Sequence, residues 1–129
     1  MSLIEIEHLT YSYPGAENPT LNDISIQIEK GDFLAIVGNN GCGKSTFCKT
    51  LNGLIPQFIS GDFSGSVIVD GLDTTTTDVG TLARKVGYVY QDFENQIVCP
   101  TVYEDASFAC MNYGLENYEE NVMNILKVC

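Results

Sequence analysis

Basic residues are scarce in this chain of 129 residues. Six lysines and arginines stand against seventeen aspartates and glutamates, and the formal net charge is −11. So few positive side chains cannot line a surface that follows a phosphate backbone, which argues against a nucleic-acid-binding protein. The same shortage argues against electrostatic docking on anionic lipid. Any anion site must therefore be formed locally, against the field of the whole chain.

Long apolar runs are also missing. No window reaches the roughly 18 consecutive apolar residues of a membrane-spanning helix, so we expect no direct membrane insertion. The first ten residues, MSLIEIEHLT, lack a basic segment followed by an apolar one, which argues against a secretory signal.

Cysteine spacing argues against two further classes of protein. The cysteines are five, an odd number, and no two are spaced CxxC. We interpret them as reduced thiols of a cytosolic protein, because a metal site would need a cluster of ligands that the sequence does not offer. They are Cys42, Cys48, Cys99, Cys110 and Cys129.

Length and composition fit one globular domain, with 44% hydrophobic and 18% charged residues. Alternation of apolar and polar residues predicts strands in LIEIEHL, with Ile4 and Ile6 on one face, and in DISIQIE. The apolar run FLAIV, residues 33–37, does not alternate, which is typical of a parallel strand buried on both faces. Residues 44–53 suit a helix that ends at Gly53.

The second half predicts short strands and helices. SVIVDG is a strand that ends in an Asp-Gly turn, and GYVYQD is a further strand. Asp78 can cap a short helix that runs to about Lys85. The capping-box spacing of Thr101 and Glu104 predicts a helix from there to near Gly114. The pair Asn117 and Glu120 repeats this spacing before a last helix, whose apolar stripe is Val122, Leu126 and Cys129.

A glycine-rich motif follows the FLAIV run. GNNGCGKST, residues 38–46, satisfies GxxxxGK[ST], the phosphate-binding P-loop. A chance match is expected in roughly one of a few hundred chains of this length. The expected strand before the motif and helix after it strengthen the assignment. The residues predicted to contact the nucleotide in this loop are Gly38, Asn39, Asn40, Gly41, Cys42, Gly43, Lys44, Ser45 and Thr46.

Each residue type in this loop has a physical reason. Glycines let the backbone curl so that successive N–H groups point inward, and the following helix adds its unpaired amides. Lys44 supplies a mobile charge for the β- and γ-phosphates, a catalytic role in phosphoryl transfer. The Ser45 hydroxyl suits Mg²⁺, which prefers oxygen ligands, and Thr46 can donate to the α-phosphate.

Two other classes of nucleotide site are disfavoured. A GTPase would carry a DxxG element and an N/TKxD motif that reads the base, and neither occurs. The stretch VIVD, residues 67–70, could be a Walker B strand whose Asp70 holds Mg²⁺. Because Gly71 follows directly, a hairpin turn is the better interpretation.

From residue 3 to its end, the sequence resembles the nucleotide-binding subunit of an ABC transporter. The segment LTYSYPGAENPTLNDISIQIEKGDFLAIVGNNGCGKST is similar to the family's opening hairpins, aromatic loop and Walker A motif, and GYVYQD resembles its Q-loop. QDFENQIVCPTVYEDASFA is similar to the stretch that marks the cobalt and energy-coupling-factor branch. The resemblance implies an α/β P-loop NTPase fold in incomplete form: antiparallel β hairpins, the P-loop strand and helix, and the start of the α-helical subdomain. Residues 1–129 would be the N-terminal part of one ABC ATP-binding domain.

The resemblance also implies roles for two residues outside the loop. Tyr13 lies where the family's aromatic loop stacks on adenine, an interaction worth about 1–3 kcal/mol in other nucleotide complexes. Tyr11 is the alternative for that role. Gln91 lies where the family's glutamine contacts Mg²⁺ and the attacking water, a catalytic and metal-binding role that Ser45 shares for the metal.

The single histidine receives no catalytic role. His8 continues the alternation of the first strand, which predicts a packing or edge position. The family's switch histidine lies far downstream of the Q-loop, so the resemblance does not extend to His8.

Four family elements are absent from these residues: the LSGGQ signature, a Walker B strand ending in Asp-Glu, the D-loop and the switch histidine. The parent protein would be an ATPase, and this chain alone is expected to be inactive. Apolar strands without neighbours would leave exposed edges, so we expect a homo-dimer, a swapped assembly or partial disorder.

We therefore expect the ATP-binding portion of a transport ATPase that couples ATP hydrolysis to uptake of a vitamin or metal ion, with ATP and Mg²⁺ as cofactors. Its partners would be a second ABC ATPase subunit and transmembrane transporter subunits, which hold it at the cytoplasmic face of the cell membrane. The alternatives are a non-transport ABC ATPase, against which the acidic balance weighs, and a non-catalytic nucleotide-binding module.

Overall fold

The structure is a computed structural model that describes residues 2–129. The chain divides into two compact units, with the boundary between Tyr88 and Val89.

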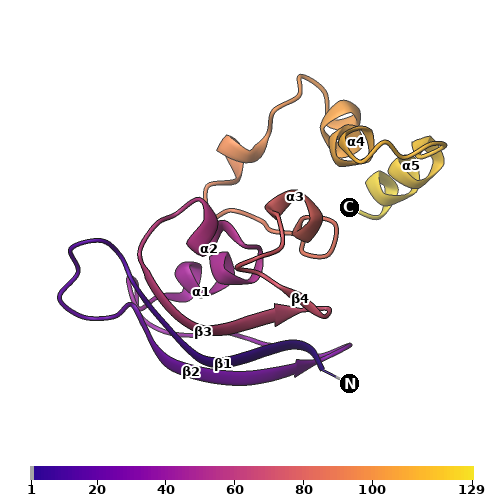
Figure 1. The fold of residues 1–129 in the computed structure, drawn as a ribbon. Helices are drawn as coiled ribbons and strands as arrows, with labels where there is room; N and C mark the ends of the chain where they lie inside the picture. Colours follow the sequence, from indigo (N-terminus) through magenta and orange to yellow (C-terminus); the bar gives the residue numbers. More distant parts are fainter. Residues whose placement is uncertain (1) are drawn as a thin grey trace. The chain divides into compact units, whose positions relative to one another are not determined.

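The first unit is built on a four-stranded sheet with the order β2-β1-β3-β4, in which every pair is antiparallel (Figure 1). Ile6 on the central strand β1 lies opposite Ile26 on β2 and Val67 on β3, so the alternation in the sequence sets the register. A slip by one residue would turn the apolar set to the other face, and burial of one face therefore fixes the pairing. The strands are β1 (Ser2–Ser12), β2 (Leu21–Glu29), β3 (Asp62–Val69) and β4 (Leu72–Asp73).

Short helices cover one face of this sheet. Figure 1 shows α1 and α2 lying over the sheet. Phe47 of α1 and Ile55 of α2 are buried in one cluster with Leu9 and Tyr11 of β1. Truncation of a buried phenylalanine to alanine typically costs about 3–5 kcal/mol, so this cluster holds α1 on the sheet. The helices of this unit are α1 (Lys44–Leu51), α2 (Leu54–Gln57) and α3 (Val79–Leu82).

Several predicted ends and caps in this unit are confirmed. Gly53 has the left-handed backbone that closes α1, with φ 77°. The Asp78 side chain accepts a hydrogen bond from the Thr81 N–H at 2.9 Å and caps α3, which ends at Leu82, short of the predicted Lys85.

The junction between the glycine loop and α1 is also packed on the sheet. Gly43 has φ 102°, and a Cβ at this position would lie 2.9 Å from the Thr20 carbonyl oxygen and 3.2 Å from Leu21 Cδ2. The Thr20 N–H donates to the Tyr11 carbonyl at 2.8 Å, so a bond to β1 holds the Thr20 carbonyl in place against Gly43. Only glycine fits here, because both the backbone angle and the space exclude a side chain.

Two strands predicted from the sequence are not formed. Residues 33–37 and 87–92 are not part of any sheet among the described residues. Phe33 is 98% exposed, Val37 87% and Val89 80%. A strand exists only when a neighbour completes its hydrogen bonds, and the described sheet offers these segments no parallel neighbour.

The prediction for His8 was wrong. The register of β1 shifts between Ile6 and Leu9, so Leu9 takes the buried position and His8 turns outward with φ 51°. β1 is also flanked on both sides, so His8 is not on an edge strand. Its Nδ1 lies 2.7 Å from Asp23 Oδ1, and its side chain is 81% exposed. A β-bulge adds one residue to the strand and so breaks the alternation on which the prediction depended.

The second unit holds a short 3-10 helix and two α-helices that contact each other. The N-cap predicted at Thr101 is confirmed, because its hydroxyl accepts from the Glu104 N–H at 3.2 Å and donates to the Glu104 carboxylate at 2.8 Å. The predicted box at Asn117 was wrong: Tyr118 precedes the last helix without a side-chain cap, and Asn117 has φ 55°. The elements are η1 (Phe93–Gln96), α4 (Val102–Asn112) and α5 (Glu119–Val128).

Two general findings concern the whole described chain. All five cysteines are free thiols, as predicted. Between residues 2 and 129, no helix is both long and apolar enough to cross a membrane.

The bulge gives a first testable prediction. The hydrogen bond to Asp23, together with the charge of that carboxylate, raises the pKa of His8. In Asp23→Asn the carboxylate is lost, while asparagine still tolerates the left-handed backbone that Asp23 adopts at φ 49°. We expect the titration midpoint of the His8 imidazole to fall in this variant. NMR can measure it without ambiguity, because His8 is the single histidine.

The sign of the stability effect follows from the same shift. The folded-state pKa of His8 lies above the value of about 6.5 for an unfolded chain. The stability that the pair contributes is therefore fully present below about pH 6.5 and is lost as the pH rises through the folded-state pKa. Equal midpoints in wild type and Asp23→Asn would show that the pair does not form.

The loop junction gives a second prediction. Gly41 and Gly43 both have positive φ, 81° and 102°, but a Cβ on Gly41 would meet nothing within 4 Å. Gly41→Ala should cost about 1–2 kcal/mol for the left-handed backbone alone. Gly43→Ala should lower the free energy of unfolding by a further 1–3 kcal/mol or so, because the methyl group meets a backbone carbonyl. Urea unfolding monitored by circular dichroism measures both, and equal losses would contradict the packing described.

Candidate functional site

The glycine loop curls through two left-handed residues. Gly41 and Gly43 have φ 81° and 102°, and between them the Cys42 N–H donates to the Asn39 carbonyl at 3.2 Å. Such a turn directs successive backbone N–H groups toward one concave side. The predicted loop residues are thus brought together as the motif requires, and Gly38 to Cys42 are exposed to solvent.

The helix that follows begins without a cap of its own. Gly43 precedes α1 without a side-chain hydrogen bond, and the first turn of α1 contains no acidic residue. The first N–H groups of an α-helix have no partner within the helix, and they carry the positive end of its dipole. The start of α1 is therefore suited to an anion, and Ser45 is exposed there.

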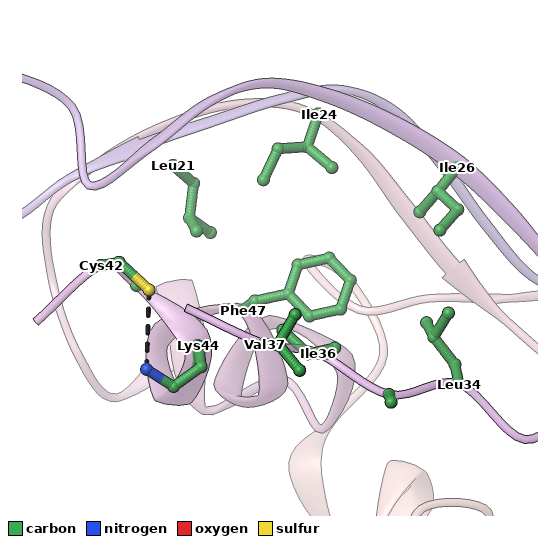
Figure 2. A pocket seen from close by; sticks show the side chains of 11 residues that line it. Leu21, Ile24, Ile26, Leu34, Ile36, Val37, Cys42, Lys44 and Phe47 are labelled. Carbon is green, nitrogen blue, oxygen red and sulfur yellow. Dashed lines mark hydrogen bonds between the residues drawn. The ribbon is translucent and has the colours of Figure 1, made fainter. Parts of the chain in front are cut away.

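Lys44 folds back over the loop. Its Nζ donates to the carbonyls of Gly38 at 2.9 Å and Asn39 at 2.8 Å. It also lies 3.6 Å from Cys42 Sγ, a contact that Figure 2 draws as a dashed line. These partners hold the ammonium group over the curled segment. The structure therefore places the Lys44 ammonium group at the loop, and its contact with a nucleotide stays a prediction.

Tyr13 reaches the same site from the end of β1. Its hydroxyl lies 3.0 Å from Thr46 Oγ1 on α1. Its ring stands edge-on to Tyr11, with centroids 5.0 Å apart and planes at 80°. Tyr11 is fully buried and donates to the Ser60 carbonyl at 3.0 Å, and burial raises its pKa. Tyr11 therefore has no exposed ring face for a base, which removes the alternative to Tyr13.

Gln91 belongs to the second unit, whereas the loop belongs to the first. It is exposed in the irregular segment that precedes η1. Its contact with Mg²⁺ stays a prediction.

Asp70 is a hairpin residue and not a Walker B aspartate. Asp70 and Gly71 have φ 48° and 76°, and they join β3 to β4 in a tight turn. The Asp70 carboxylate lies 2.7 Å from Lys85 Nζ, which lowers its pKa. Across residues 2–129, no group of three or more His, Cys, Asp or Glu side chains could hold a metal ion.

An apolar pocket of about 420 Å³ lies beside the loop. In Figure 2, side chains of β2 face those of the segment 34–37 across it, and Phe47 lies between them. Its walls are mainly aliphatic, so it offers a poor environment for phosphate. The polar donors that suit an anion lie on the loop itself.

Sequence reasoning missed Thr20 and Leu21 as residues that position the site. They fix Gly43 from the side of the sheet, where Thr20 directly precedes β2 and Leu21 is its first residue. A glycine before the lysine of the motif indicates a close approach, but nothing in the sequence says which segment approaches. The bond between Tyr13 and Thr46 was likewise not foreseen, because it joins positions 33 residues apart.

Comparisons with known proteins identify the family. The model of the ABC transporter family matches residues 21–127. A Pyrococcus horikoshii protein described as an ABC transporter ATP-binding protein is 47% identical over 119 residues, which are 92% of this chain and 42% of that protein. The energy-coupling factor transporter ATP-binding protein EcfA1 of Latilactobacillus sakei is 44% identical over 117 residues, 91% of this chain and 40% of EcfA1.

A solved structure agrees with these relatives. The structure of cbiO1 from Clostridium perfringens, part of the ABC transporter complex cbiONQ, has a TM-score of 0.73 and 30% sequence identity over 95% of this chain and 47% of that chain. The α/β P-loop NTPase fold expected from the sequence is thereby confirmed in its incomplete form. The chain spans less than half the length of these relatives. It belongs to the ABC transporter family, and within that family it corresponds to the ATP-binding domain.

Proposed function

We propose that this chain binds ATP with Mg²⁺ at residues 38–46, as the ATP-binding portion of an energy-coupling-factor-type transport ATPase. The observation that carries the proposal is the geometry at the start of α1. Two left-handed glycines, an uncapped helix start and a lysine ammonium group converge on one exposed loop. These groups suit the phosphates of a nucleotide.

The roles of the residues follow from their chemistry. Lys44 would exchange its bonds to the Gly38 and Asn39 carbonyls for phosphate oxygens, which are stronger acceptors because they are charged. The Ser45 hydroxyl is a hard oxygen ligand of the kind that Mg²⁺ prefers. The metal ion, when bound, would neutralise charge on the phosphates. Tyr13 would offer its ring to the adenine, and Gln91 of the second unit would contact the metal and the attacking water.

The transport role is proposed from the relatives. EcfA1 is named as part of an energy-coupling factor transporter and cbiO1 as part of the complex cbiONQ. By analogy, this chain would act with a second ABC ATPase subunit and with transmembrane subunits at the inner face of the cell membrane. ATP hydrolysis by the whole protein would drive uptake of a vitamin or a metal ion, selected by the membrane partners. Residues 1–129 would form the N-terminal part of one ATP-binding domain.

Nucleotide binding is the direct test. The chain should bind ATP with Mg²⁺, and Lys44→Ala should weaken binding by about tenfold or more, since bonds from a charged group are worth about 1.5–3 kcal/mol. Isothermal titration calorimetry measures both. Lys49→Ala is the matched control, because it removes the same charge from the last turn of α1. If both variants bind like wild type, the loop is not the phosphate site.

Turnover is the second test. Sequence elements that the family uses for hydrolysis are absent from these 129 residues. Because phosphoryl transfer depends almost entirely on positioning and charge stabilisation, we expect no ATPase activity of this chain above the Lys44→Ala background. Release of inorganic phosphate at saturating ATP and Mg²⁺ measures it. Turnover that disappears in Lys44→Ala would contradict the expectation and assign catalysis to the chain by itself.

A further inference from the structure

We propose that the Tyr13 hydroxyl is a positioning group for the phosphates of the nucleotide. Through its hydrogen bond to Thr46, it would aim the Thr46 hydroxyl proton at the P-loop. The inference rests on the proposed nucleotide site and gives the phenol of Tyr13 a role separate from stacking of its ring on a base.

The environment of Thr46 limits its hydrogen-bond partners. Thr46 is 6% exposed, and the Tyr13 hydroxyl lies 3.0 Å from its Oγ1. A buried hydroxyl needs a partner, and little water can reach this one. Thr50, one turn later on α1, shows the usual alternative: its hydroxyl donates to the Phe47 carbonyl at 2.7 Å. Thr46 differs from Thr50 because its partner lies on another element.

The number of hydroxyl protons indicates which group donates when phosphate is bound. Each of the two hydroxyls has one proton and can also accept. When Tyr13 donates to Thr46, the proton of Thr46 is free for an acceptor on the side of the loop. An anion held by Lys44 and the first turn of α1 is such an acceptor. The arrangement with Thr46 as the donor would turn its proton away from the phosphates, so bound phosphate favours the first arrangement.

The Tyr13 ring is held in place on the sheet. It is partly buried against the core and stands edge-on to Tyr11, at a centroid distance of 5.0 Å. A phenol fixed in this way loses little rotational freedom when it orients a neighbour, so its contribution should appear as affinity.

Inorganic tripolyphosphate separates the two roles of Tyr13, because it carries the phosphates and lacks a base. Tyr13→Phe keeps the ring and removes the hydroxyl. We expect this variant to weaken binding of tripolyphosphate with Mg²⁺ and of ATP with Mg²⁺ by the same factor, about two- to tenfold, the value of one hydrogen bond. Calorimetric titration of the 129-residue chain measures both. Unchanged affinity for tripolyphosphate in Tyr13→Phe would overturn the proposal.

Substitutions at Thr46 test whether the Tyr13 hydroxyl acts through Thr46. Thr46→Val should weaken tripolyphosphate binding, Thr46→Ser should restore it, and Tyr13→Phe should have no further effect in the Thr46→Val background. An equal loss from Tyr13→Phe in both backgrounds would overturn the proposal, because the phenol would then act without Thr46.

Tyr11→Phe is the matched control for loss of a tyrosine hydroxyl. It removes the bond to the Ser60 carbonyl, and we expect lower thermal stability with unchanged affinity for tripolyphosphate. A loss of affinity equal to that in Tyr13→Phe would overturn the proposal, because general destabilisation would then explain both variants. If wild type binds neither ATP nor tripolyphosphate, the proposed function itself fails and the inference fails with it.

Discussion

The contact of Gly43, at the start of α1, with Thr20 and Leu21, at the start of β2, is the constraint on which the loop depends. Gly43 lies so close to the Thr20 carbonyl that a Cβ would be 2.9 Å from it, and Thr20 is bonded in turn to Tyr11 of the central strand. One turn into the helix, Phe47 is buried in the same core. Gly43 and Phe47 are thus two fixed points about one turn apart, and together they set the position and direction of α1. The sheet therefore determines where the N-terminal amides of α1 point.

This local construction accounts for an anion site being proposed on an acidic chain. With a net charge of −11, the field of the whole molecule repels a nucleotide. Exposed charges more than about 8–10 Å apart are largely screened at physiological salt, whereas groups in contact are not. The ammonium group of Lys44 and the N-terminal amides of α1 act within contact distance. In the proposed nucleotide site, their effect would outweigh a surplus of carboxylates spread over the rest of the surface.

The sequence predicted most of what depends on neighbours along the chain. The alternation in β1 and β2, the Asp-Gly hairpin and the caps at Asp78 and Thr101 are local, and the structure contains them. The P-loop motif is contiguous too, and the structure shows its left-handed glycines and the helix α1 that follows them. Errors arose where one local feature changes the pattern, as at the bulge that turns His8 outward. The contacts of Thr46 and Gly43 join distant segments, and no periodicity encodes them.

The two predicted strands that do not form also depend on contacts between distant segments. β1 pairs with β2 across a short loop, whereas a parallel pair requires a crossover of a dozen residues or more. Residues 33–37 have the composition of a central strand, yet Phe33 and Val37 face solvent, because no parallel partner stands beside them in the described sheet. The P-loop keeps its shape nevertheless, since Gly43 and Phe47 anchor it to the antiparallel sheet on its other side. Under the proposed function, binding of phosphate and completion of the parallel sheet would be separable: the first would depend on the contacts of α1, and the second depends on neighbours for residues 33–37.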